Sequence, residues 1–195
     1  RAGAEPRFAI SADLARLSTH ATGRWPGVSG LSAALSGTDQ RGRVSLAVRK
    51  GSVEWPRWLR GPVRDVDANG QVDWSRNERA WVFRSPAVEL RHPQVRARGA
   101  FELTAGPGGD SPRLALDARV EEADVGIVRQ VLPIGRLEPR SIAWLDGAFV
   151  QGRVTRGEVT YRGPVRRFPF RGGEGEFLAV ADVAGTTIDY FPGFA

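Results

Sequence analysis

The chain has 195 residues, a formal net charge of +6, no cysteine and two histidines. Without cysteine, disulfides and thiolate metal sites are excluded, and His20 and His92 are too far apart in sequence to suggest a histidine-rich metal site. Lys50 is the only lysine among 28 basic residues, which are spread along the chain and balanced by 22 acids, so we expect no nucleic-acid partner.

No run of the sequence approaches the roughly 18 consecutive apolar residues of a membrane-spanning helix, and no signal peptide is present. The chain contains no methionine. We therefore expect a piece of a longer protein, with any membrane anchor in sequence outside this chain.

Alternation of apolar and polar residues, the pattern of a half-buried strand, dominates residues 1–121. A helix over residues 13–18 is a weaker expectation after a first strand. Strands are predicted where apolar residues recur at every second position, over residues 44–48, 66–74, 95–105 and 114–120. Such strands have one wet face and one apolar face, and the short turns between them predict an antiparallel meander.

Helical spacing, with apolar residues three and four positions apart, occurs over residues 124–132 and 139–146. Pro139 suits the first turn of the second helix and Gly147 suits its C-terminal cap. Alternation then resumes around residues 154–161 and 177–183. We expect one segment over 1–195, composed of a strand-rich part (1–121), short helices (122–149) and further strands (150–195).

Two architectures can bury so many apolar strand faces with so few helices. A closed β-sandwich folds the sheet onto itself. A curved, trough-like sheet turns its apolar walls toward each other or leaves room for hydrocarbon. Small residues at inward positions favour the second, since a sandwich core needs bulky side chains throughout; these positions are Ala68, Gly70, Ala97, Gly99, Ala179 and Ala181.

Residues 65–73 match the opening of a calcium-binding loop, Asp-x-Asp-x-Asn-Gly. The twelfth position, where a bidentate glutamate belongs, is Arg76, and the same residues are the polar phase of an alternating strand. We therefore expect no metal site and no cofactor.

No catalytic motif competes for the function. There is no Gly-x-Ser-x-Gly, no phosphate-binding loop and no nucleophile with a nearby histidine. Glu121, Glu122 and Asp124 are adjacent acids, but they lead into a helix start, where acidic side chains favour the helix dipole. The sequence does not predict an enzyme.

Several different short motifs follow one another along the chain in a characteristic order. They are Trp25-Pro-Gly-Val-Ser-Gly-Leu, Gly42-Arg-Val-Ser-Leu, Val53-Glu-Trp-Pro, Gly70-Gln-Val-Asp-Trp, Leu132-Pro, Trp144-Leu, Ala148 to Gly152, Phe168-Pro-Phe and Tyr190 to Gly193. Each motif is weak alone, but their order resembles the large AsmA-like proteins of the YhdP family, found in the envelope of Gram-negative bacteria. The resemblance runs through essentially the whole chain.

This resemblance implies a mainly β fold, a twisted antiparallel sheet curved into a groove with two or three short helices. In this respect the family is similar to TamB and to the eukaryotic bridge-like lipid transfer proteins. It implies phospholipid transport between inner and outer membranes and a periplasmic location as part of an inner-membrane-anchored protein. Phospholipid is the expected partner, with the membrane reached through sequence outside this chain.

The expected groove lining is Val44, Leu46, Val48, Val72, Trp74, Phe101, Leu103, Leu114, Leu116, Val154, Tyr161 and Phe177. Arginines around the Phe168-Pro-Phe turn suit phosphate and are candidate headgroup contacts, although a solvated loop explains them more simply; they are Arg162, Arg166, Arg167 and Arg171. The alternative function is a closed β-sandwich acting as a structural or protein-interaction module of the envelope.

Overall fold

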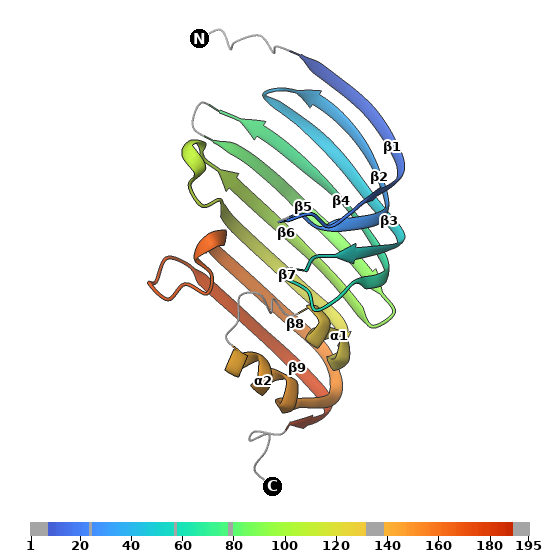
Figure 1. The fold of residues 1–195 in the computed structure, drawn as a ribbon, viewed down its shortest axis with the longest axis vertical. Coiled ribbons are helices and arrows are strands. Elements are labelled where there is room, and N and C mark those ends of the chain that lie inside the picture. Colours follow the sequence, from blue (N-terminus) through green and yellow to red (C-terminus); the bar gives the residue numbers. More distant parts are fainter. Residues whose placement is uncertain (1–7, 24, 57, 78–79, 132–138, 189–195) are drawn as a thin grey trace.

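Nine antiparallel strands form a single sheet in which every strand pairs with its neighbours in sequence (Figure 1). The computed structural model describes residues 8–23, 25–56, 58–77, 80–131 and 139–188. The strands are β1 (Ala9–Thr19), β2 (Gly27–Thr38), β3 (Arg41–Glu54), β4 (Val63–Arg76), β5 (Trp81–His92), β6 (Val95–Ala105), β7 (Arg113–Asp124), β8 (Phe149–Pro164) and β9 (Glu176–Ile188).

Helices are few and short. The helix α1 (Val125–Val131) follows β7 directly, and α2 (Pro139–Ala148) leads directly into β8. Short 3-10 turns lie at Pro107–Gly109 and Val165–Arg167. The mainly β fold, its open curved sheet and the helices expected over 124–132 and 139–146 are confirmed within the described residues, which exclude Leu132. Because the described strands belong to one sheet, a closed β-sandwich is not formed.

The helix expected over residues 13–18 is wrong, because these residues lie within β1. Leu14 is opposite Ala33 of β2, but Leu17 is opposite Leu31, so β1 carries one extra residue between the two pairs. This bulge spaces Leu14 and Leu17 three residues apart on a strand, which imitates the spacing of a helix. Arg16 sits in the bulge with a φ of 51°.

Similar irregularities occur in the next three strands. Gly30, Lys50 and Asp65 have φ values of 70°, 42° and 56°, and the register shifts beside each of them. Bulges bend a strand and increase its local twist. A column of bulges across β1–β4 therefore bends all four strands together.

The bend is directed toward one face of the sheet. Beyond it, Val63 and Val66 of β4 pack in one cluster with Ile127 of α1, Ala123 and Val154. Leu59, in the connection between β3 and β4, packs on the same cluster, and the Arg60 N–H donates to the Gln130 carbonyl of α1 across 3.3 Å. The curled strand ends and α1 thus cover one end of this face.

Lys50→Gly tests whether the bulge geometry is strained. A residue other than glycine in the left-handed region costs roughly 1–2 kcal/mol, which glycine avoids at the cost of greater freedom in the unfolded chain. We expect the substitution to raise the free energy of unfolding by up to about 1 kcal/mol, measured by urea denaturation. Arg49→Gly, one residue earlier and not among the positive-φ positions, is the control and should be destabilising. Equal losses in both variants would contradict the strained bulge.

Candidate functional site

Rows of apolar residues run across the sheet from strand to strand. Trp74, Phe83, Leu103 and Leu114 are direct partners on β4, β5, β6 and β7. A neighbouring row crosses eight strands through Ala33, Leu46, Gly70, Val88, Gly99, Ala118, Val159 and Ala179. Since direct partners share a face of the sheet, these rows form one continuous surface, here called the apolar face.

All twelve residues expected to line a groove lie on the apolar face. Val44 pairs with Val72, and Phe101, Leu116, Tyr161 and Phe177 are partners in succession. Val154 is a partner of Ala123, and both residues belong to the cluster that contains Ile127 of α1. The remaining members follow by alternation along the same strands: Leu46, Val48, Trp74, Leu103 and Leu114.

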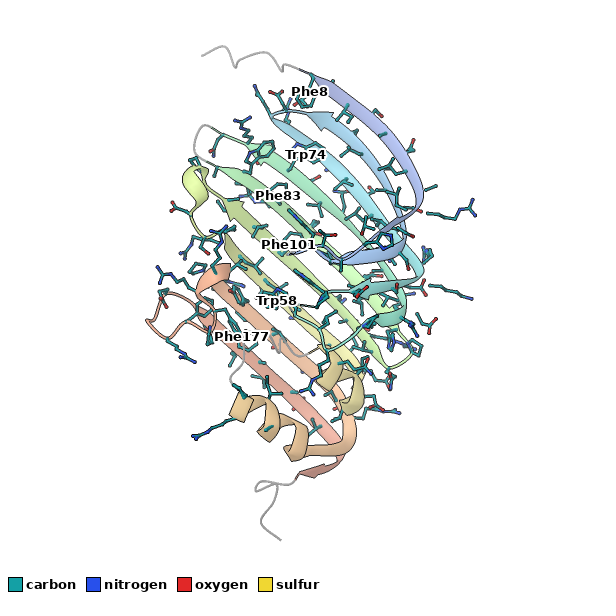
Figure 2. All side chains as sticks on the ribbon, in the orientation of Figure 1. Phe8, Trp58, Trp74, Phe83, Phe101 and Phe177 are labelled. Atoms are coloured by element: carbon teal, nitrogen blue, oxygen red, sulfur yellow. The ribbon has the colours of Figure 1, made fainter. Side chains whose placement is uncertain are left out.

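Most of this face keeps contact with solvent. Of these twelve residues, Val48, Val154 and Tyr161 are buried, Phe177 is 48% exposed and the others are half-buried. Figure 2 shows Trp74, Phe101 and Phe177 on well-separated strands of the sheet. Such an uncovered apolar surface marks an interaction site more often than a stable solvent-facing surface.

The largest of these side chains lies flat on its neighbours. The Trp74 indole extends over Gly37 and Gly42, where an added Cβ would overlap its ring. Its Nε1–H donates to the Thr38 carbonyl across 3.3 Å. Glycines on β2 and β3 therefore make room for an indole that keeps the apolar face smooth at this end.

Sequence reasoning missed the contribution of β5, which adds Phe83, Val88 and Leu90 to the apolar face. Alternation in this strand is interrupted between Ser85 and Val88, where its pairing with β6 shifts register. The apolar residues on each side of the interruption are the signal that could have identified the strand.

The opposite face carries arginines and acids in alternation. Arg43, Asp73, Arg84 and Glu102 are direct partners on β3 to β6, and Arg43–Asp73 and Arg84–Glu102 form ion pairs of 2.6 Å. Further cross-strand pairs join Arg119 to Glu158 and Arg153 to Glu122. Opposite charges on adjacent strands stabilise this pairing, and they hydrate this face, here called the charged face.

The four candidate headgroup arginines are in two different environments. Arg162 lies opposite Glu176 and Ala115 on the charged face, where its guanidinium donates to Asp117 and to the Leu116 and Tyr161 carbonyls. Arg166 donates to the Gly109 carbonyl across 2.8 Å, and its side chain is exposed. Arg167 and Arg171 are also exposed in the segment that follows β8.

Residues 65–73 form part of β4 rather than a loop. Asp67 accepts a hydrogen bond from the Lys50 N–H, and Asp73 pairs with Arg43. Among the described residues, no group of three or more histidine, aspartate or glutamate side chains could hold a metal ion. No described helix has the length and apolar character needed to cross a membrane.

The Arg43–Asp73 pair gives the charged face a measurable pH dependence. The hydrogen bond from Arg43 lowers the pKa of Asp73, although partial desolvation opposes this effect. A carboxyl with a lower pKa in the folded state stabilises the fold above its unfolded pKa, and this contribution is lost as the pH falls through the folded pKa.

Asp73→Asn should therefore reduce stability at neutral pH and lose this effect on acidification below about pH 4. Urea denaturation of both proteins over this range measures the gap between them. Asp110→Asn, in the exposed turn before β7, is the matched control and should show no such closing gap. A difference for Asp73→Asn that is independent of pH would contradict the assignment.

Comparison with known proteins gives these features a family context. The YhdP protein family matches residues 1–195. The intermembrane phospholipid transporter YhdP of Escherichia coli (strain K12) is 22% identical over 167 residues, which make up 86% of this chain and 13% of that relative. No solved structure matches the chain. The chain belongs to the YhdP protein family.

Proposed function

We propose that this chain is one section of a phospholipid conduit, in which acyl chains lie on the apolar face and move across the strands. The observation that carries the proposal is the continuity of the apolar rows over eight strands whose side chains remain largely half-exposed. The similarity to an intermembrane phospholipid transporter supports the same substrate class.

The energetics of such a path require no specific contact. Removing a methylene group from water is worth about 0.8 kcal/mol, so an acyl chain gains free energy at any position along a uniform apolar surface. Because the free energy of binding is similar at each row, an acyl chain can slide from one row to the next. Valine, leucine, alanine and phenylalanine side chains on the apolar face provide such a surface.

Both edges of the sheet are consistent with a section of a longer path. Ile10 and Leu14 of β1 and Phe177 and Val183 of β9 lie on the apolar face and are more than 40% exposed. In the proposed full-length protein, further strands continue the apolar face on each side. The relative, of which the matched region is 13%, has ample sequence for such strands.

For the headgroup we propose the exposed arginines that follow β8, Arg166, Arg167 and Arg171, at the rim of the apolar face. Guanidinium groups suit phosphate oxygens in geometry and charge. The charged face would remain in water. We further propose that the protein is a carrier rather than an enzyme, and that it acts in the periplasm, anchored to the inner membrane through sequence outside this chain.

Site-specific photocrosslinking in the full-length protein tests the proposal, with the probe at Leu103 or at Glu102. Leu103 lies on the apolar face between Phe83 and Leu114, whereas its neighbour Glu102 lies on the charged face opposite Arg84. We expect phospholipid adducts at Leu103 and none at Glu102, detected by mass spectrometry of the crosslinked protein.

Glu102 is a matched control because it shares the strand, the depth in the sheet and the distance from either edge. Adducts at neither position, in folded and active protein, would favour the structural or protein-interaction module. Adducts at both positions would show membrane proximity without a path on the apolar face.

A further inference from the structure

Within the part of the chain that the structure describes, two clusters of side chains cover the apolar face at opposite ends of β8. The helix cluster consists of Val63, Val66, Ala123, Ile127 and Val154, with α1 as its cover. The aromatic cluster consists of Tyr161, Phe168, Phe170 and Phe177. Phe168 and Phe170 come from the segment between β8 and β9. Figure 1 shows this segment and α1 at opposite ends of β8.

The aromatic cluster is compact. The Tyr161 ring centroid lies 5.1 Å from that of Phe170 and 5.9 Å from that of Phe168, and Phe168 is 5.4 Å from Phe177. Tyr161, Phe168 and Phe170 are each less than 10% exposed. Tilted and edge-on contacts at such distances are favourable ring geometries.

The segment that carries these rings is tied to the turn before β7. The Val165 N–H donates to the Pro112 carbonyl across 2.8 Å, and the Arg166 N–H donates to the Ser111 hydroxyl across 3.0 Å. The Arg166 guanidinium adds a bond of 2.8 Å to the Gly109 carbonyl. These anchors hold Phe168 and Phe170 over the sheet.

Between the two covers, the free width of the apolar face decreases along the sheet. On β4, Gly70, Val72 and Trp74 belong to neither cluster. On β7, Leu114 and Leu116 pack against the aromatic cluster, while Val120 and Ala123 pack in the helix cluster. In the clusters formed by the described residues, Ala118 is the one inward position of β7 that belongs to neither.

The passage that remains is narrow. Leu116 and Val120 are four residues apart, which is about 13 Å along a strand. The side chains of these two residues, and the clusters packed against them, occupy part of that span. Across β8 and β9 the passage continues over Val159 and Ala179, the successive partners of Ala118. The free face thus narrows from three inward positions on β4 to one on β7.

We propose that this narrowing is a constriction that selects lipids by the width of their acyl region. Two acyl chains pass between the aromatic cluster and the helix cluster, whereas lipids with four or more chains are held back. This inference rests on the proposed conduit and adds the class of substrate that it admits. Phe168 and Phe170 act as selectivity residues, because their rings fill the apolar volume that additional chains would need.

The first experiment narrows the passage and measures lipid on both sides of it in the full-length protein. Photoreactive probes are placed at Val72 of β4 or at Val183 of β9, both on the apolar face. Ala118→Leu should reduce phospholipid adducts about tenfold at whichever probe lies downstream, because overpacking the floor penalises passage. Ala115→Leu is the matched control, the same change on the same strand but on the charged face, and should leave both adducts unchanged.

The outcomes separate this inference from the proposed function. Adducts at neither Val72 nor Val183 in the unsubstituted protein would refute the conduit itself. Adducts at both probes that persist in Ala118→Leu would leave the conduit intact and refute the constriction. Ala118→Val provides a milder version if the leucine variant does not accumulate as folded protein, and the same criteria apply.

The second experiment widens the passage. The full-length Phe168→Ala/Phe170→Ala protein is purified and its bound lipids are identified by mass spectrometry. We expect the share of lipids with four or more acyl chains to rise about tenfold relative to two-chain phospholipids. Arg43→Ala/Arg84→Ala removes two large side chains from the charged face, outside both clusters, and should leave the composition unchanged. An unaltered composition in the double variant would overturn the selectivity role.

Discussion

A slip of one residue between two strands would turn every side chain of one strand to the wrong face, and the whole molecule depends on avoiding it. The strands keep their apolar side chains on one face although several contain bulges, where one strand has more residues than its partner. The register shift between β6 and β7 is followed by another between β8 and β9. As a result, Val95, Ala123, Val154 and Val183 remain successive partners on one face.

The same irregularities that preserve the faces also give the sheet its shape. Bulges in β1–β4 bring the strand ends over the apolar face, where they meet α1. The cross-strand ion pairs on the opposite face make that surface hydrophilic. Curvature and charge together leave apolar side chains partly exposed on the inner side of the bend.

Strands with strict alternation could be predicted from sequence, and so could the common face of the twelve residues expected to line a groove, because period two fixes which side chains share a face. β1 was mistaken in part for a helix because its bulge at Arg16 changes the spacing of Leu14 and Leu17. The packing of Phe168 and Phe170 against Leu114 and Leu116 could not be anticipated. It depends on a contact between a loop and a strand some 50 residues earlier, which local periodicity does not encode.

The order of strands in space is the same as their order along the chain. Within the described residues, each new strand pairs with the strand made just before it, so most loop closures involve short stretches of chain, with residues 125–148 between β7 and β8 as the longer connection. Assembly can therefore proceed by adding one strand after another, as in solenoid proteins, where stability is the sum of local units and nearest-neighbour terms. A protein with this connectivity can lengthen by gaining hairpins during evolution without rearranging those already present.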